Sequence, residues 1–267
     1  MKTNILRVLF VQSKIEGNQP LAAKKNILRQ IKANLHHKPH LVMLPEVCLG
    51  SSVSKIWHDL YLQEYDSLIM ELTAMAQAEG VCFYGSAYKA RDKGLPYNTA
   101  FFIGPDRVKK SYNKIHLFKY HHEHKIYASG DRIEIFKTPL GVIAPLICYD
   151  IRFPELMREQ CFRGAKMALV CAQWPLARRE HWLCLLRARA IENQMFVIAC
   201  NATGVVNENI KLGGSSCIFS PWGELMYQMS ATQKTGVIEI NTNAIDETRK
   251  AYPFLRDARR KDFHFGL

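Results

Sequence analysis

The chain has 267 residues, of which 48% are hydrophobic, and it carries a formal net charge of +12 at pH 7. This length and apolar content suit one large domain with a sizeable core. No apolar stretch approaches the roughly 18 residues that a bilayer crossing needs, and the N-terminus lacks a signal-peptide profile. We therefore expect a cytoplasmic protein with no membrane partner.

The positive charge and the cysteines have ordinary interpretations. Lys and Arg are spread along the chain without an aromatic-interleaved basic motif, so no nucleic-acid partner is predicted, and a basic surface that attracts small anions is favoured. The eight cysteines form no CxxC pair and mostly lie in apolar runs such as 167–171. Neither a disulfide framework nor a zinc site is indicated.

Strands and helices alternate in the first part of the chain. Residues 5–11 are typical of a strand, 22–35 place apolar side chains at helical spacing, and 41–44 form another apolar strand ending at Pro45-Glu46. The following segments predict a helix at about 64–79, a strand at 81–85, a strand at 98–103, a turn at 104–106 and a strand toward Tyr112.

A polar, His-rich loop at 119–130 separates these elements from a second series. The pattern there predicts a strand at 142–148, a helix opened by Pro154, a strand at 166–171, a helix at 179–193, a strand at 196–200, and strands to 240 with a turn at 221–223. Such β-α-β units with meanders imply a layered α/β protein in which two sheets pack together under helices. We expect one domain at 1–243 and a tail at 244–267.

Glu46 and Cys148 both follow apolar strands, at the sheet edge where ligands collect in α/β proteins. A helix starting near Phe153-Pro154 would favour the Cys148 thiolate over a thiol with an ordinary pKa of about 8.5. A structural cysteine and a solvated loop glutamate are the alternatives. A partly desolvated Glu46 would serve as a general base.

Two further polar positions stand out between these strands. Lys114 is framed by apolar and aromatic residues in 112–118, where its cation would stabilise an oxyanion; the alternative is a surface lysine whose stem packs on Leu117. Residues 121–124, His-His-Glu-His, superficially suggest a metal site. Because no partner stands at a recognised ligand spacing, a polar loop with one useful glutamate, Glu123, is favoured over zinc.

Three segments together resemble motifs of the nitrilase superfamily in order and spacing. They are Leu-Pro-Glu at 44–46, Tyr-Asn-Lys-Ile-His-Leu-Phe at 112–118 and Leu-Ile-Cys-Tyr-Asp-Ile-Arg-Phe-Pro-Glu at 146–155. The resemblance extends over nearly the whole chain, and segments 123–130, 174–182 and 188–194 look like the bacterial omega-amidase branch. It implies a four-layer α-β-β-α sandwich.

The resemblance also implies roles for individual residues. Cys148 would be the nucleophile, Glu46 the general base, Lys114 the oxyanion-stabilising cation and Glu123 a second glutamate that orients the others. The backbone N–H of Tyr149 would share the oxyanion with Lys114. Ammonia would leave, water would hydrolyse the thioester, and no metal or organic cofactor would be required.

The omega-amidase branch implies a short 2-oxo acid with a terminal amide, such as 2-oxoglutaramate or 2-oxosuccinamate. Its carboxylate would need a cation, and a guanidinium matches a carboxylate best. Arg152 is the first candidate, although it could instead form ion pairs with Asp150 and Glu155. Arg178 is the second, and Trp174 would wall the pocket.

Three alternatives remain open from the sequence. A hydrolase of N-carbamoyl amino acids or other small amides would share the catalytic residues and differ in its pocket. A papain-like protease would need a histidine base, which a Glu-Lys-Cys set does not supply. A non-enzymatic basic binding protein would show salt-sensitive nucleic-acid binding. The resemblance further implies a homodimer in which helices after Cys148 and the tail at 244–267 contact a second subunit.

Overall fold

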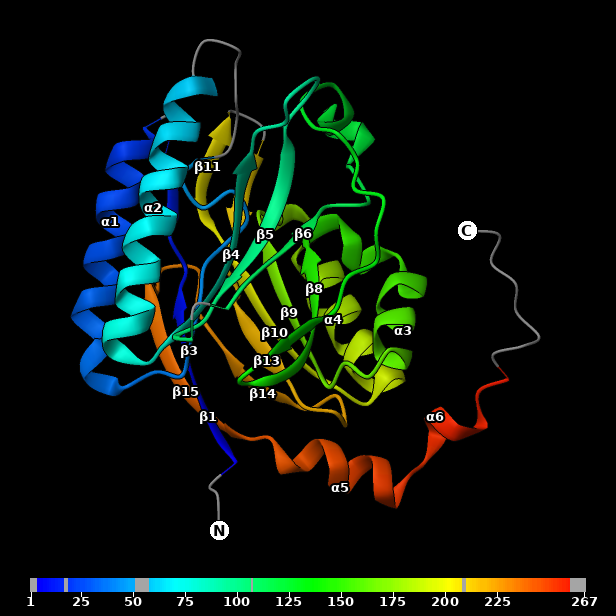
Figure 1. Cartoon of the computed structure of the whole chain (residues 1–267). Helices are drawn as coiled ribbons and strands as arrows, with labels where there is room; N and C mark the ends of the chain where they lie inside the picture. Colours follow the sequence, from blue (N-terminus) through cyan, green and yellow to red (C-terminus); the bar gives the residue numbers. More distant parts are fainter. Residues whose placement is uncertain (1–3, 17–18, 51–57, 107, 208–209, 260–267) are drawn as a thin grey trace.

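Two six-stranded sheets pack face to face between layers of helices in the computed structural model (Figure 1). The structure describes residues 4–16, 19–50, 58–106, 108–207 and 210–259. The first sheet has the spatial order β15 (Thr235–Asn241), β1 (Ile5–Val11), β3 (Leu41–Met43), β4 (Cys82–Lys89), β5 (Tyr97–Ile103) and β6 (Lys109–Asn113). The second has the order β14 (Leu225–Gln228), β13 (Cys217–Phe219), β10 (Phe196–Asn201), β9 (Met167–Ala172), β8 (Gly141–Ile147) and β7 (Phe136–Thr138).

Helices cover the outer face of each sheet. The first sheet is covered by α1 (Pro20–Asn34) and α2 (His58–Glu79), and the second by α3 (Pro154–Phe162) and α4 (Arg179–Asn193) (Figure 1). A small third sheet has the order β12 (Ile210–Gly213), β11 (Thr203–Asn207) and β2 (Lys14–Glu16). The layered α-β-β-α sandwich that the sequence predicted is confirmed.

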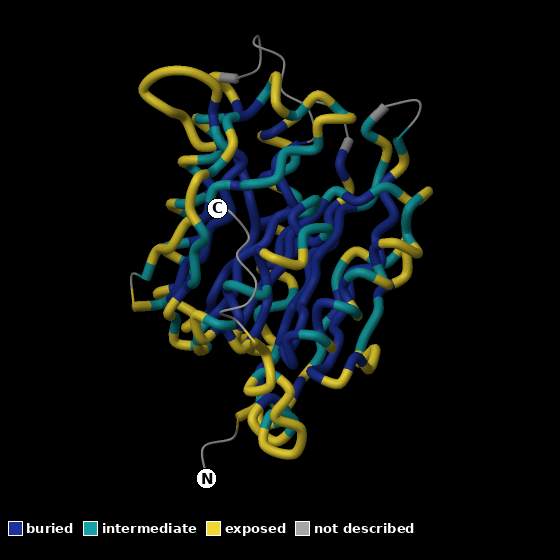
Figure 2. Tube along the Cα trace, turned by 90° about the vertical axis from the view of Figure 1, so that its right-hand side faces the viewer, coloured by how far each residue is buried: buried dark blue, intermediate teal, exposed yellow. Residues whose placement is uncertain are grey.

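The strands at the centre of the molecule are buried on both faces (Figure 2). In β1, Val8 and Phe10 face the cluster between the two sheets, whereas Leu9 and Val11 belong to the cluster under α1 and α2. Successive side chains of a strand point to opposite faces, so both faces of β1 must be apolar. This double burial explains the continuous apolar run at 5–11.

Most predicted elements appear close to their expected positions, and α4 has the predicted bounds. The helix expected at about 64–79 begins earlier, at His58, and the three-residue strands β2 and β7 were not anticipated because they are too short to show a period. None of the helices in the described ranges combines the length and apolar character needed to cross a bilayer.

The chain after β15 continues as α5 (Asn243–Ala251) and the short α6 (Phe254–Asp257). Ile245 of α5 is buried and belongs to the main core cluster, and the Arg249 side chain donates to the Gln194 and Asn193 carbonyls. Residues 260–267 of the expected tail lie outside the described residues. The division into 1–243 and 244–267 stays a prediction.

Candidate active site

Glu46 and Cys148 come from different sheets and line one pocket. Glu46 follows β3, which runs parallel to β1 and β4, and Cys148 follows β8, which runs parallel to β9. Gln173, just beyond the end of β9, also lines the pocket. The carboxyl ends of parallel strands from both sheets therefore converge on one site, as expected for α/β proteins.

The backbone is strained at both strand ends. Cys148 has a φ of 47° and Val47, directly after Glu46, has a φ of 39°. L-residues rarely occupy this left-handed region, least of all a β-branched valine, and each such residue costs roughly 1–3 kcal/mol. Strain of this kind persists where packing fixes the chain, and it is concentrated at functional sites.

The sequence predicted that Cys148 ends the strand at 142–148. In the structure the strand ends one residue earlier, and Cys148 begins a short 3-10 helix, η5 (Cys148–Arg152). Its loop is tied to the segment that carries Lys114 by the fully buried Asp150. One Asp150 oxygen accepts from the Tyr112 hydroxyl at 2.9 Å and from the Ile147 N–H at 3.0 Å. The other accepts from the His116 N–H at 3.1 Å. The nucleophile loop and the lysine segment are thereby held in a fixed relation.

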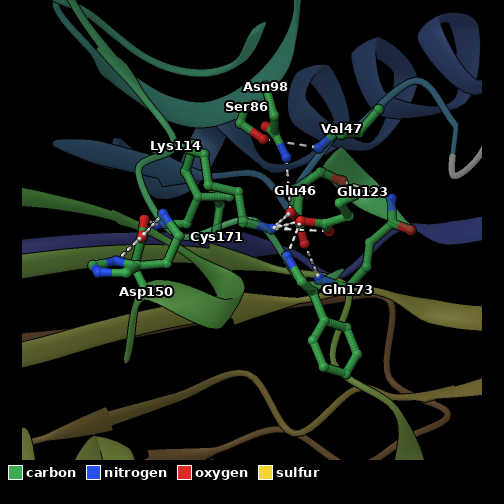
Figure 3. Close-up of polar contacts among 12 residues, drawn as sticks. Glu46, Val47, Ser86, Asn98, Lys114, Glu123, Asp150, Cys171 and Gln173 are labelled. Atoms are coloured by element: carbon green, nitrogen blue, oxygen red, sulfur yellow. Dashed lines mark hydrogen bonds and ion pairs between the residues drawn. The ribbon is translucent and has the colours of Figure 1, made fainter. Parts of the chain in front are cut away.

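Lys114 is fully buried beneath the pocket, so the alternative of a surface lysine packed on Leu117 is wrong. Its ammonium lies 2.8 Å from Glu46 Oε1 and 3.0 Å from each Glu123 carboxylate oxygen (Figure 3). A close approach of two chain segments makes this burial possible. Gly130 donates its N–H to the Lys114 carbonyl, and a Cβ at Gly130 would lie 2.2 Å from the Asn113 oxygen.

Each carboxylate oxygen of Glu46 accepts a hydrogen bond from a group other than Lys114. Asn98 donates from Nδ2 to Oε1 at 2.8 Å, and the Gln173 backbone N–H donates to Oε2 at 2.9 Å (Figure 3). The Gln173 side chain also donates to the Glu46 carbonyl at 2.8 Å. Sequence reasoning missed Asn98 and Gln173. Gln173 carried the same signal as Glu46 and Cys148, because it is a polar residue directly after a buried strand.

Glu123 stands in the loop between β6 and β7, at the start of the 3-10 turn η4 (Glu123–Lys125). Its Oε2 also accepts from the Phe118 N–H at 2.7 Å, so both of its oxygens are held. The structure thus places Glu123, the loop glutamate that the sequence singled out, beside Lys114. In the described ranges, no group of three His, Cys, Asp or Glu side chains is arranged to hold a metal ion.

The charges of this cluster decide the protonation of its members. Burial alone would lower the pKa of Lys114, but the Glu46 and Glu123 carboxylates outweigh it and hold that pKa well above its ordinary value. Burial and then the Glu46 carboxylate raise the pKa of the Cys148 thiol, and Lys114 offsets only part of this rise. These groups oppose the expected preference for a thiolate and favour a protonated thiol in the resting site, with the Glu46 carboxylate in the same pocket to accept its proton.

Arg152, Arg178 and Trp174 form a second group of lining residues, which we call the far end of the pocket, and it carries two guanidinium groups. Arg152 lies 4.9 Å over the Trp174 ring and 3.4 Å from the His181 Nδ1, and Arg178 lies 5.5 Å over the Phe118 ring. Both line the pocket with Trp174. In the described part of the chain neither arginine is paired with a carboxylate, so Arg152 does not form the ion pairs with Asp150 and Glu155 that were its alternative role.

The pocket has a volume of about 230 Å³, below the roughly 300–1,000 Å³ of sites for drug-sized ligands. Cys148, Glu46, Glu123 and Gln173 are the lining residues of what we call its catalytic end, and Tyr149 adds an aromatic wall. The lining residues that the sequence did not reveal come from three loops, from strand β5 and from the β11-β12 hairpin. They are Val47, Asn98, Phe118, His121, Ile126, Tyr127, Gln173, Pro175, Val206, Ile210 and Leu212.

Comparisons with known proteins agree with this geometry. The family model described as carbon-nitrogen hydrolase matches residues 18–250. A 2-oxoglutaramate amidase of Bacillus subtilis is 36% identical over 71% of this chain and 73% of its own length. A hydrolase encoded in the agr operon of Staphylococcus aureus is also 36% identical, over 95% of this chain and 98% of that protein.

A solved structure of a carbon-nitrogen hydrolase superfamily protein from Xanthomonas campestris superimposes with a TM-score of 0.85 at 26% identity. It covers 98% of this chain and 99% of that one. These matches confirm the resemblance to the nitrilase superfamily and its omega-amidase branch, and they favour an enzyme over a non-enzymatic binding protein. The chain belongs to the carbon-nitrogen hydrolase family and is an amidase of the nitrilase superfamily.

Proposed function

We propose that the protein hydrolyses small amides through a thioester on Cys148. The observation that carries this proposal is that the Cys148 thiol and the Glu46 carboxylate line one small pocket, with the buried Lys114 ammonium 2.8 Å from that carboxylate. The charges of Glu46, Lys114 and Glu123 all act on the Cys148 thiol and shift its pKa. Such a set matches nucleophile, base and oxyanion donor in acyl transfer.

The reaction follows from the hydrogen bonds of Glu46. Among the described residues, its Oε1 accepts from Lys114 and Asn98, whereas Oε2 accepts only from the Gln173 N–H and retains a lone pair for the thiol proton. As sulfur bonds to the amide carbon, Lys114 and the Tyr149 N–H stabilise the oxyanion. Glu46 then returns the proton to the leaving nitrogen, and ammonia departs.

Water completes the cycle. Glu46 takes a proton from the water, whose oxygen attacks the thioester carbon, and the C–S bond breaks. The carboxylic acid is released. The thiol is regenerated with the proton that Glu46 returns. Glu123 holds Lys114 in place through two bonds, so it acts on both steps by positioning the ammonium. The residues present suffice for these steps without a metal or organic cofactor.

We further propose that the substrate carries a carboxylate at the end opposite its amide. Arg152 and Arg178 line the pocket without a carboxylate partner in the described residues, and a guanidinium pairs with a carboxylate bidentately. A pocket of about 230 Å³ suits a molecule of a few carbons. Together with the amidase relatives, these features favour a 2-oxo acid amide such as 2-oxoglutaramate or 2-oxosuccinamate.

The substrate is tested by comparing kcat/KM for 2-oxoglutaramate, its carboxamide-capped analogue and glutamine. We expect the capped analogue to be weaker by about 10²-fold or more, because it leaves the guanidinium groups unpaired. Arg178→Gln and Arg152→Gln should reduce this difference by raising KM for the anionic amide alone. Arg163→Gln is the matched control, since Arg163 is paired with Glu159 and does not line the pocket.

An N-carbamoyl amino acid added to this panel tests the second candidate, a hydrolase of N-carbamoyl amino acids. That substrate would bring a carboxylate to the same arginines but present a ureido carbon to Cys148 and release carbon dioxide as well as ammonia. Equal kcat/KM values for all three amides contradict the carboxylate proposal and leave the Cys148 chemistry standing.

We also propose a cytoplasmic homodimer. Buried cysteines serve here as small apolar core residues, which suits a reducing compartment. An exposed aromatic group supports the second copy: the Trp222 and Tyr252 rings lie 4.7 Å apart, and Phe254 lies 5.7 Å from Tyr252. Tyr252 and Phe254 of this group lie after residue 243, in the region that we expect at a dimer contact. Light scattering during gel filtration would show a monomer if the proposal is wrong, and Trp222→Ser together with Phe254→Ser should shift a dimer toward monomer.

A further inference from the structure

His121 is the one histidine of the 121–124 loop that reaches the pocket. It closes the short 3-10 helix η3 (Lys119–His121) and lines the pocket, whereas His122 and His124 are exposed and do not line it. Its ring lies 4.7 Å from that of Phe118. The Arg178 guanidinium lies 5.5 Å over the same Phe118 ring. An imidazole and a guanidinium therefore share one aromatic support at the far end of the pocket.

The imidazole of His121 is available to a ligand. Neither ring nitrogen has a hydrogen-bond partner within the part of the chain that the structure describes, and the ring is only partly buried. The Tyr120 and His121 ring centroids lie 5.3 Å apart in a T-shaped arrangement. An unbonded ring nitrogen in a pocket with two guanidinium groups can donate to an anion when it is protonated.

The groups around His121 hold it neutral in the empty pocket. Burial comes first, followed by the positive charge of Arg178, and both lower the pKa of His121 below its ordinary value. His122 acts in the same direction, and the Glu123 carboxylate opposes them. The unperturbed pKa of histidine is about 6.5, so the free imidazole is largely uncharged at neutral pH.

We propose that His121 takes up a proton when a carboxylate-bearing amide occupies the pocket, so that His121 and Arg178 bind the carboxylate together. This inference rests on the proposed substrate class. The carboxylate compensates the charge of Arg178 that disfavours the imidazolium, and it supplies an acceptor for the free ring nitrogen. His121 is thus a specificity residue whose charge appears only with the correct ligand.

The sign of the pH dependence follows from linkage. The pKa of His121 is lowered in the free site and rises in the complex. Affinity for the anion is therefore constant above the bound-state pKa, increases as the pH falls between the two pKa values, and is constant again below the free-state pKa. A difference of one unit changes affinity about tenfold, and a neutral amide shows no such change.

Titration calorimetry on the full-length Cys148→Ala variant measures this uptake directly. 2-Oxoglutaramate is titrated at pH 6.5 in two buffers that differ in ionisation enthalpy, and the difference in apparent heat gives the protons bound per site. We expect about half a proton near the midpoint and a Kd about tenfold lower at pH 5.5 than at pH 8. The capped amide should bind without uptake.

His121→Gln should abolish the uptake and flatten the pH dependence of Kd, while still binding the anion through Arg178. His124→Gln is the matched control, because it removes an exposed imidazole from the same loop; its uptake should equal that of the parent. Uptake that persists in His121→Gln overturns the inference, as does tight, anion-selective binding with no uptake at all. An anionic amide that binds no better than the capped one at any pH overturns the proposed substrate class as well.

Discussion

The two ends of the pocket are built differently. At the catalytic end, Lys114 is fully buried and bonded to two carboxylates, and both oxygens of Glu46 accept hydrogen bonds from fixed donors. At the far end, Arg152 and Arg178 lie on aromatic rings with half-exposed guanidinium groups. The catalytic end is rigid before any ligand binds. The far end holds cations that have no carboxylate partner among the described residues.

This difference separates chemistry from recognition. Preorganised charges lower the barrier of a reaction because they need not reorganise as charge develops. A cation on an aromatic face retains its unused donors, so it can pair with whichever anion fits. Changes at the catalytic end should therefore appear in kcat for every amide, whereas changes at the far end should appear in KM for anionic amides.

The largest effect is expected at Cys148. Cys148→Ala should reduce turnover to background, because no other thiol of the described chain lines the pocket. Cys184→Ser is the control, since Cys184 is exposed on α4 and outside the site. Initial rates of ammonia release measure both. Retained activity in Cys148→Ala would remove the thioester from the mechanism.

The next largest loss of activity is expected when the charge of Glu46 or Lys114 is removed. Glu46→Gln and Lys114→Met should each lower kcat by about 10²-fold or more with little change in KM, as for loss of a base or an oxyanion donor. Lys114→Met should also destabilise the fold by about 3–5 kcal/mol, because it leaves two carboxylates buried together. Lys166→Met, at an exposed pair with Asp246, is the control in denaturant melts. A change confined to KM would mean that these groups only bind substrate.

Glu123→Gln should have an intermediate effect. The amide can still contact Lys114 through its oxygen, but it cannot accept from the ammonium at both atoms as the carboxylate does. We expect a loss in kcat smaller than that of Glu46→Gln. Steady-state kinetics on the single and double variants would measure their coupling, and additive losses would show that Glu123 and Glu46 act independently.

The last prediction concerns alkylation of the resting enzyme, without substrate turnover. Because the pKa of Cys148 is raised, the thiolate fraction, and with it the rate of iodoacetamide modification, should rise about tenfold per pH unit from pH 7 to 9 without a plateau. Glu46→Gln should speed alkylation at pH 8 while slowing turnover, since the carboxylate raises that pKa. Peptide mass mapping distinguishes Cys148 from Cys184. A plateau below pH 8 would indicate a preformed thiolate.

Sequence patterns predicted the layers and the catalytic end because both follow local rules. Strands buried on two faces are continuous apolar runs, and Glu46 and Cys148 stand where such runs end. At the far end the sequence singled out Arg152, Arg178 and Trp174 but not His121 and Phe118, because these two reach the pocket only through the path of a loop that has no period. The protonation of Cys148 was also out of reach, since it depends on how deeply three charges are buried around one sulfur.

The catalytic set is divided between the two sheets, and this division affects refolding. Glu46 and Lys114 follow strands of the first sheet, and Cys148 and Gln173 follow strands of the second. The Tyr84 hydroxyl, which contacts the Leu146 backbone at 3.0 and 3.1 Å, is one polar link across the interface. A folding intermediate in which each sheet has formed but the two have not docked has a native-like circular dichroism spectrum and no active site. Recovery of activity should therefore lag behind recovery of secondary structure, and the lag reports the rate at which the sheets dock.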